Sequence, residues 1–454
     1  MNIKLYRSST LGIKSENFKL LTDPWLTDGE YYGSWSHYPH YDIHKNIDEL
    51  NSHDAIYISH IHPDHCSVDT LKKLNKNIPV YISNYHAKFL KLKIERLGFK
   101  VFELENGVRK KLGNNFFLTI YPADNCDPEL CFKFNGCAKL DDSIKGSQQI
   151  DSLSVIDDGK FVLLNVNDCP FELAKHVIKN KVLKEFNKID ILFTGYGGAG
   201  PYPQCFDNLS EDAKIKESKK KEISFLKQAI NFIELTKPEY YLPFAGTYVL
   251  SGKLNFLQNL RGVPSIDKAY EYLYDKVKSL NIKVNPKPIM LNTDKSFDLI
   301  NKSYSSEYLK LDHKKFIRYQ KDYLRNLKLD YEKDDAINEI DIFQNANEAM
   351  NNYIKKKDEL NIDIKSDVYL KFFEKFIKIS SNKDKIDIIT KDGIDKNKSY
   401  VVYNLDPKLL NRILKGPRYA HWNNAEIGSH INFFRSPNIF ERNLYYSMNF
   451  FHNL

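Results

Sequence analysis

Cysteine, methionine and tryptophan are scarce in this sequence. The 454 residues include 6 cysteines, 4 methionines and 3 tryptophans. Six cysteines do not make a disulfide framework in a chain of this length, which excludes the small disulfide-rich secreted domains. No window approaches the run of about 18 apolar residues that a transmembrane helix needs, and no secretory leader precedes the first predicted strand. These absences predict a cytoplasmic protein with no membrane partner.

A strong charge of one sign is also missing. Lysine and arginine exceed aspartate and glutamate by 67 − 59 = 8. The basic residues are spread through helical stretches such as KIKESKKKEISFLK, which is typical of solvated helix faces rather than of a nucleic-acid-binding patch. We therefore expect no nucleic-acid partner and a small-molecule substrate, and an acidic metabolite would suit the mild positive excess.

The first 300 residues alternate short β-rich runs with turns and helical stretches. Apolar residues make up 42% of the chain, with 28 Phe and 29 Tyr, which is ample for a large core. Helical periodicity is found at about residues 85–97, 170–186 and 211–236, between runs such as DAIYISH and DILFTGYGG. This order predicts an α/β (α+β) fold, a two-sheet sandwich with helices outside. We place the first domain at residues 1–300.

The remaining residues, 301–454, form a second predicted region that is mainly helical. The stretches YLKLDHKKFIRYQKDYLRNLKL and VYLKFFEKFIKI are both predicted as helices. A small α+β tail follows, with strand-like KIDIIT and SYVVYNLD and a helix at PKLLNRILKG.

The stretch YISHIHPDHCS holds 3 of the 13 histidines of the chain. The run DAIYIS predicts a buried strand that ends at His60. His60 and His62 are two residues apart, so in an extended segment both rings project to the same side. Pro63 turns the chain, and Asp64 and His65 fall on that turn. Four nitrogen and oxygen ligands at one strand end predict a metal site.

The pattern His-x-His-x-Asp-His after an apolar strand resembles the signature of the metallo-β-lactamase superfamily. The resemblance implies an αββα sandwich with two metal ions at its edge. His60 and His62 would bind the first metal, and Asp64 and His65 the second. Asp168, at the end of the run FVLLNVNDC, would bridge both. Asp64 and Asp168 are then also the candidate catalytic residues.

Further stretches narrow the resemblance. LLTDPWLT, TGYGGAGPYP and YYLPFAGTYV are similar to the lactamase-like part of CMP-N-acetylneuraminate hydroxylases over about residues 18–250, and HWNNAEIGSHINFFR resembles the tail of that group. The resemblance implies iron-dependent hydroxylation of an N-acyl group on a nucleotide sugar. Candidate substrate-binding residues are Gly198, Gly200, Tyr202, His421 and Trp422.

Each of these candidates also has a plainer structural interpretation. The glycines would suit a tight loop, and Trp422 would suit a core. Asp23 in TDPWL either orients a ligand histidine or holds a turn. WSHYPHYDIH, at residues 35–44, is aromatic and rich in histidine, and we expect it to form a loop at the mouth of the site.

The sequence departs from the family pattern in three places. No Rieske ligand pattern occurs, so an oxygenase of this kind would take electrons from a separate electron-transfer protein. The third histidine of the first metal, expected after FFLTIYP, is replaced: Asn125 occupies the position, between Asp124 and Asp127. A final histidine near YLPFAG is also absent.

This ligand set is rich in oxygen, which favours iron or manganese over zinc. We therefore predict two divalent metal ions, with iron favoured, and a hydroxylase. Two alternatives remain open. The same geometry suits a metal-dependent hydrolase of phosphoesters or lactones, and loss of two histidines suits a non-catalytic metal-binding partner protein.

Overall fold

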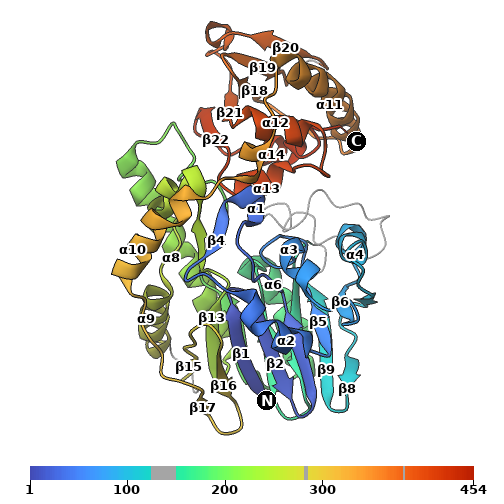
Figure 1. The fold of residues 1–454 in the computed structure, drawn as a ribbon, viewed down its shortest axis with the longest axis vertical. Coiled ribbons are helices and arrows are strands. Elements are labelled where there is room, and N and C mark those ends of the chain that lie inside the picture. The colour runs from blue at the N-terminus through green and yellow to red at the C-terminus, as the bar shows by residue number, and fades with distance from the viewer. Residues whose placement is uncertain (124–149, 281–284, 382–383, 454) are drawn as a thin grey trace.

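The structure is a computed structural model that describes residues 1–123, 150–280, 285–381 and 384–453. Its N-terminal part is a sandwich of two β-sheets with helices on both outer faces (Figure 1). This is the predicted αββα arrangement, which is thereby confirmed. The predicted metal-binding residues Asp124 and Asp127, and Asn125 between them, lie outside the described residues.

One sheet has eight strands in the order β17-β16-β1-β2-β3-β5-β6-β7. Neighbouring strands from β17 to β3 are antiparallel, and β3, β5, β6 and β7 are parallel. The strands are β1 (Asn2–Arg7), β2 (Thr10–Ser15), β3 (Phe18–Thr22), β5 (Ala55–Tyr57), β6 (Val80–Ser83), β7 (Val101–Leu104), β16 (Lys295–Asp298) and β17 (Ser303–Tyr304).

The other sheet has seven strands in the order β15-β13-β12-β11-β10-β9-β8. Strands β8 to β11 are antiparallel neighbours, and β11, β12, β13 and β15 are parallel. They are β8 (Lys110–Gly113), β9 (Phe116–Pro122), β10 (Ser152–Asp157), β11 (Val162–Asn165), β12 (Ile191–Gly195), β13 (Tyr240–Phe244) and β15 (Lys287–Pro288). A short ribbon pairs β4 (Trp35–His37) with β14 (Tyr248–Leu250).

Three apolar layers hold the sandwich together. Between the sheets lie buried side chains such as Leu20, Ile120 and Phe193. One outer layer packs under α2 (Ile47–Asn51), α3 (Val68–Lys73) and α4 (Phe89–Glu95). The other packs under α6 (Phe171–Val177), the π-helix η2 (Ile178–Val182), α7 (Leu183–Glu185), α8 (Glu211–Thr236) and α9 (Ile266–Lys278). Each fully buried aliphatic side chain contributes about 1.5–3 kcal/mol.

The C-terminal part contains a five-stranded sheet in the order β20-β19-β18-β21-β22. Its strands are β18 (Asp367–Phe372), β19 (Lys375–Ile379), β20 (Ile386–Ile389), β21 (Tyr400–Asn404) and β22 (Asn432–Ser436). The helices around it are α11 (Glu339–Glu359), α12 (Pro407–Leu414), α13 (Trp422–Ile427) and α14 (Arg442–Met448).

One sequence-based prediction in this region is wrong. VYLKFFEKFIKI is the hairpin β18–β19 and not a helix. Its apolar side chains alternate along each strand, so that Val368 and Leu370 reach the core. Phe373, with φ 48°, turns the chain between the strands. Parallel pairing of β18 with the distant β21 also favours the strand, and a helix prediction from local periodicity does not include such pairing.

The predicted boundary at residue 300 stays a prediction. Beyond it, β17 still extends the eight-stranded sheet, and Phe316 of α10 (His313–Asp322) packs against Tyr38 with ring centroids 4.7 Å apart. The short helices η4 (Leu324–Asn326) and η5 (Asp330–Lys333) then lead into the C-terminal part. The stretch predicted as one long helix is therefore α10 followed by short turns.

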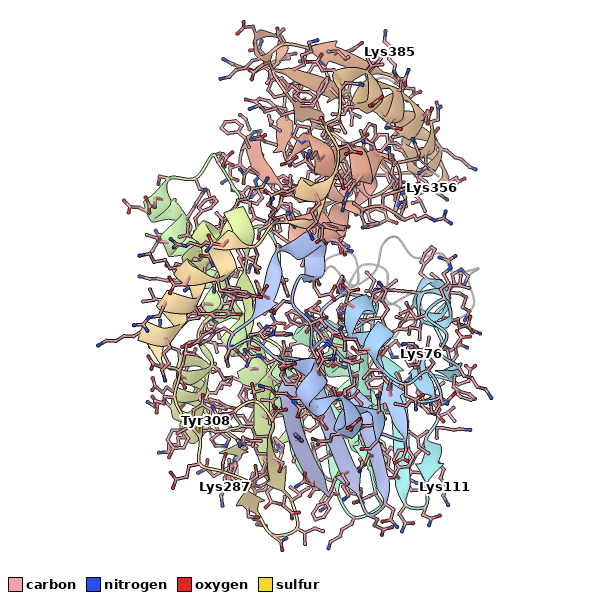
Figure 2. All side chains as sticks on the ribbon, in the orientation of Figure 1. Lys76, Lys111, Lys287, Tyr308, Lys356 and Lys385 are labelled. Carbon is pink, nitrogen blue, oxygen red and sulfur yellow. The ribbon has the colours of Figure 1, made fainter. Side chains whose placement is uncertain are left out.

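Lysines are spread over the outside of the molecule. Figure 2 labels Lys111 and Lys287 near one end, Lys76 midway, and Lys356 and Lys385 towards the other end. This distribution agrees with a dispersed positive charge. In the described parts of the chain, no helix is long and apolar enough to cross a bilayer.

Candidate metal centre

The strand ends of both sheets meet at one edge of the sandwich, and the histidine motif lies there. β5 ends at Tyr57 and leads directly to His60 and the turn that carries Asp64 and His65. β11 ends at Asn165 and leads to Asp168 on the facing sheet. The predicted ligands from these two distant segments are thus brought together.

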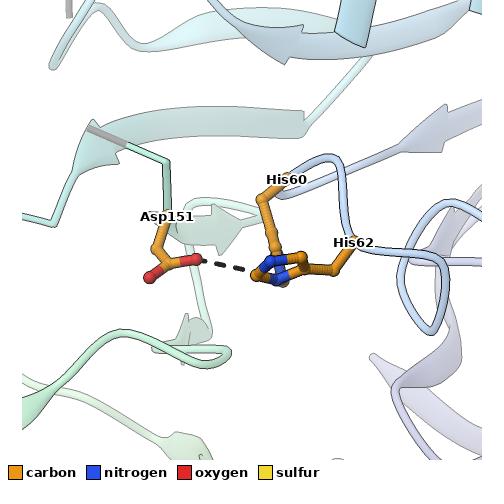
Figure 3. A group of neighbouring side chains, drawn as sticks. All are labelled: His60, His62 and Asp151. Atoms are coloured by element: carbon orange, nitrogen blue, oxygen red, sulfur yellow. Dashed lines mark ion pairs between the residues drawn. The ribbon is translucent and has the colours of Figure 1, made fainter. Parts of the chain in front are cut away.

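His60, His62 and Asp151 form a first group of potential ligands (Figure 3). One ligand atom of each residue lies within 4.8 Å of the others. The Nε2 atom of His60 is 3.8 Å from Oδ1 of Asp151. Two imidazoles and a carboxylate at this spacing can bind one divalent ion.

His60, His65 and Asp168 form a second group with the same spacing. The Nε2 atom of His65 is 3.4 Å from Oδ2 of Asp168 and 3.6 Å from Oδ2 of Asp64. The shared histidine, His60, joins the two groups, so the arrangement is suited to two neighbouring ions.

Three ligand atoms in this cluster are buried and have no hydrogen-bond partner among the described residues. They are Nε2 of His60, Nε2 of His65 and Oδ1 of Asp151. A buried polar atom without a partner costs free energy, so such atoms in one place indicate a missing ligand. The residues present therefore fit metal ions.

Asp23 holds the second histidine in place. Its Oδ2 lies 3.0 Å from Nδ1 of His65, and it accepts hydrogen bonds from the backbone and hydroxyl of Ser59. An acceptor at Nδ1 leaves Nε2 of His65 free to face a metal. The predicted contact between Asp23 and a histidine of the motif is present.

Tyr31 is a member of the site that the sequence did not indicate. Its hydroxyl donates a hydrogen bond to Oδ1 of Asp64. It lies in α1 (Glu30–Gly33), where Tyr31 and Tyr32 both have left-handed backbone angles, with φ 51° and 59°. Such angles are costly for non-glycine residues and are concentrated at functional sites.

The electrostatics of the cluster reflect crowded carboxylates. Burial and Asp168 raise the pKa of Asp64, and burial followed by Asp168 raises the pKa of Asp151 to about 6. Burial opposes protonation of His65, but Asp168, Asp23 and Asp64 outweigh it and raise its pKa well above the usual value. Bound cations would balance the negative charge that gathers here.

Asp151 is the ligand candidate that sequence reasoning missed. The family pattern places the third ligand after β9, at Asn125. Strand β10 runs antiparallel to β9, and Pro122 pairs with Ser152. The residue just before β10 therefore lies at the same edge as the residues after β9. The antiparallel pairing was the signal that would have found it.

The predicted substrate-binding residues differ in their surroundings. Gly198 packs against Phe225, whose ring leaves no room for a Cβ, while Gly200 has φ 103° and open space. The Tyr202 hydroxyl donates to Glu217. Trp422 is fully buried in the C-terminal core and donates to the Phe451 carbonyl, so it offers no surface to a ligand.

His421 lies near the metal cluster. Burial, and after it the nearby His452 and His62, lower its pKa to about 4. Its backbone N–H donates to the Tyr32 hydroxyl over 2.6 Å. The C-terminal part therefore brings a histidine within electrostatic reach of the first ligand group. Substrate contact by Gly198, Gly200, Tyr202 and His421 stays a prediction.

Comparison with known proteins agrees with the predicted resemblance. Residues 2–156 match the sequence model described as beta-lactamase superfamily domain. A Mycobacterium tuberculosis protein named for a Rieske 2Fe-2S iron–sulfur centre is 26% identical over 238 residues, 52% of this chain and 41% of that protein. The cytidine monophosphate-N-acetylneuraminic acid hydroxylase of Danio rerio is 28% identical over 247 residues, 52% of this chain and 36% of the hydroxylase. The matched part spans less than half of either relative.

Solved structures show only distant similarity. CmlA, a diiron beta-hydroxylase from Streptomyces venezuelae, aligns with a TM-score of 0.38 and 14% identity over 63% of this chain and 52% of that chain. A possible metal-dependent hydrolase from Veillonella parvula aligns with a TM-score of 0.43 and 13% identity over 65% of this chain and 98% of that chain.

Proposed function

Since residues 2–156 carry a β-lactamase superfamily domain, we propose that this chain is a metal-dependent hydroxylase of a small acidic molecule. The observation that carries the proposal is the composition of the ligand cluster. Asp151 stands beside His60 and His62, where a third imidazole would favour zinc. A carboxylate there favours iron or manganese. The similarity to a nucleotide-sugar hydroxylase supports the same reaction class.

The ligands divide between two ions. His60, His62 and Asp151 would hold the first, and Asp64 and His65 the second. Oδ2 of Asp168 lies 3.9 Å from Nε2 of His60 and 3.4 Å from Nε2 of His65, so Asp168 would contribute to both ligand sets. Asp124 and Asp127 stay predicted ligands for the first ion. Two iron ions, when bound, would supply the oxygen chemistry of a hydroxylation.

The other residues of the site have positioning roles. Asp23 fixes the ring of His65, and the Tyr31 hydroxyl fixes one oxygen of Asp64. The Asp168 side chain is 39% exposed, whereas the His60 and His65 side chains are fully buried. A substrate would therefore approach from the side of Asp168.

The proposed reaction needs an electron source. Hydroxylation of a C–H bond by dioxygen consumes two electrons and two protons, and it yields the alcohol and water. We propose a separate ferredoxin or Rieske-type protein as the donor, and a nucleotide sugar as one candidate substrate. The similarity to a Rieske-named protein supports this choice of donor.

Elemental analysis and oxygen uptake together test the proposal. We expect freshly purified protein to contain iron, and its absorption spectrum to change between the reduced and oxidised states. Oxygen uptake should require both the reduced donor protein and an acidic substrate. His62→Ala and Asp168→Ala should lose most bound iron and the uptake, while circular dichroism shows an intact fold.

Two other outcomes would point to other functions. Anaerobic cleavage of a phosphoester or lactone probe with zinc or manganese would contradict the hydroxylase and indicate a hydrolase. A partner protein that stays bound after chelation, with neither activity present, would indicate a non-catalytic binding protein.

A further inference from the structure

Arg7 is a buried arginine that forms no ion pair with any residue that the structure describes. It ends β1, at the same edge of the sandwich as the metal cluster, and is 6% exposed. Its Nη1 donates to the Thr293 hydroxyl over 2.7 Å. Its Nε and Nη2 are buried and have no hydrogen-bond partner among the described residues.

The carboxylates nearest to Arg7 are engaged elsewhere. Asp28 accepts from the His37 backbone over 2.6 Å and pairs with His40 over 2.8 Å. Asp294 accepts from Tyr41 over 3.1 Å. Both carboxylates act on Arg7 only through space, and no ion pair of Arg7 is found in the described parts of the chain.

The charge of Arg7 therefore lacks compensation. Burial lowers its pKa to about 10, so the guanidinium still carries its charge near neutral pH. A buried charge without a partner destabilises a fold unless a ligand supplies the missing acceptors. The fork of donor groups in arginine matches the oxygens of a carboxylate or phosphate.

Two hydroxyl groups near Arg7 are also unpartnered. Those of Tyr196 and Tyr319 are buried, have no hydrogen-bond partner among the described residues and lie within electrostatic reach of Arg7. Tyr196 follows β12, and its ring packs so closely under Gly246 that a Cβ there would lie 2.6 Å from it. The stretches TGYGGAGPYP and YYLPFAGTYV thus meet beside Arg7.

The backbone is strained where these segments join. Ser8, next to Arg7, has φ 46°, and Ala245, next to Gly246, has φ 54°. The Ala245 N–H donates to the Ser8 carbonyl over 3.3 Å. Left-handed angles at two facing non-glycine residues are costly, and such strain is typical of ligand-binding sites.

An open surface hollow lies on the other side of Tyr319. It has a volume of about 340 Å³ and is lined by Tyr38, Lys315, Arg318, Tyr319, Asp322 and Tyr323. Tyr319 belongs to both places, since its ring lines the hollow and its hydroxyl is buried near Arg7. Lys315 and Arg318 make the wall of the hollow basic, with Asp322 as the one acid in its lining. Tyr38 directly follows β4.

We propose that Arg7 binds the carboxylate or phosphate group of a small molecule, which reaches it from this hollow past Tyr319. The Tyr196 and Tyr319 hydroxyls would donate to the same group, and the three tyrosines of the hollow would contact the rest of the ligand. Arg7 and the histidine motif belong to strands three positions apart, about 14 Å. The anion site therefore does not depend on the metal ligands.

Titration of the full chain with inorganic phosphate and with acetate tests the site. We expect a saturable rise in the unfolding temperature with at least one of them, and saturable heat in calorimetry, because a ligand of the native state alone stabilises it. Phosphate alone would identify a phosphate ester as the ligand class, and acetate alone a carboxylic acid. Absence of saturable binding by both anions would overturn the proposal.

Substitutions distinguish an arginine that binds an anion from one that only stabilises the fold. Arg7→Met should weaken anion binding roughly ten- to hundred-fold, while the ligand-free protein is as stable as before or more stable. The exposed Arg96→Met removes the same charge and should leave binding unchanged. Unchanged binding in Arg7→Met, or loss of binding only in Arg318→Met, would contradict the proposal.

Two further variants complete the test. Tyr319→Phe removes only the hydroxyl and should also weaken anion binding, which gives a readout even where Arg7→Met does not fold. Asp168→Ala should lose metal and keep anion binding. That result distinguishes a failed metal proposal from a failed anion site.

Discussion

At the edge of the sandwich that carries the histidine motif, single residues are expected to set which metal binds. A carboxylate at Asp151 instead of an imidazole changes the ligand set of the first ion from nitrogen-rich to mixed, which shifts the preference towards iron or manganese. Oδ1 of Asp151 is buried and has no hydrogen-bond partner among the described residues, so it is available to a cation. We therefore expect the preferred metal to depend on one aspartate outside the histidine motif.

Asp151→Asn tests this directly. The amide keeps the shape but cannot supply a charged ligand, so binding of the first ion should weaken at least ten-fold, since loss of a mere supporting residue already costs about 10–100-fold. Metal titration measures the change. Asp48→Asn, an exposed aspartate of α2, is the matched control and should titrate like the natural protein. Equal affinity in Asp151→Asn would mean that another residue completes the first site.

At the scale of elements, α1 joins the metal centre to the C-terminal part. Tyr31 reaches Asp64 from this segment, while His430 donates to the Tyr31 carbonyl over 2.7 Å. Gly33, with φ 89°, closes α1, and a Cβ there would lie 3.0 Å from the Leu329 backbone. The segment is therefore held on one side by the cluster and on the other by the chain that leads to η5.

Two alanine substitutions in α1 and its N-cap distinguish the cost of a left-handed backbone angle from the cost of a steric clash. Gly29 and Gly33 both have positive φ, but a Cβ at Gly29 meets nothing closer than 4.0 Å. Both Gly29→Ala and Gly33→Ala should lose about 1 kcal/mol from the left-handed angle, and Gly33→Ala should lose a further 1–3 kcal/mol, roughly, from the collision. Urea denaturation measures both. Equal losses would show that the backbone of Leu329 moves away freely.

At the scale of the whole molecule, one apolar core runs through both predicted domains. Trp25, Trp35 and Leu329 belong to the same buried cluster as Leu409 and Trp422. The backbone of Phe433 also exchanges hydrogen bonds of 2.7 Å with Cys205 and Asp207. The C-terminal part is thus packed onto the sandwich rather than attached by a linker, and the two parts should unfold together.

The buried His430 at this junction predicts acid sensitivity. Its Nδ1 lies 3.1 Å from the Tyr331 hydroxyl, and its Nε2 donates to the Tyr31 carbonyl. Burial lowers its pKa from 6.5 to about 4. Between these values the unfolded chain binds the extra proton, so stability is lost as pH falls from about 6.5 to about 4, by roughly 3 kcal/mol.

Urea denaturation across this pH range checks the effect. His430→Gln should reduce the slope of the free energy of unfolding against pH, because the amide can keep both hydrogen bonds and does not titrate. His176→Gln, at an exposed histidine of α6, should leave the slope unchanged. A slope that is the same in the natural protein and in both variants would exclude His430 as a source of the acid sensitivity.

The sequence alone predicted the sandwich and the strand that leads to His60, because local patterns set which side chains share a face. The ligand set His60, His62, Asp64, His65 and Asp168 came from the histidine motif and the family resemblance, and it stays a prediction. Only the tertiary structure decided the roles of Asp151, Tyr31 and Arg7. Each meets its partners through strands or helices distant in the chain, and no local pattern encodes such a meeting. The hairpin β18–β19 was also decided by tertiary structure. Its pairing with the distant β21 outweighs the helix propensity of its lysines and glutamate.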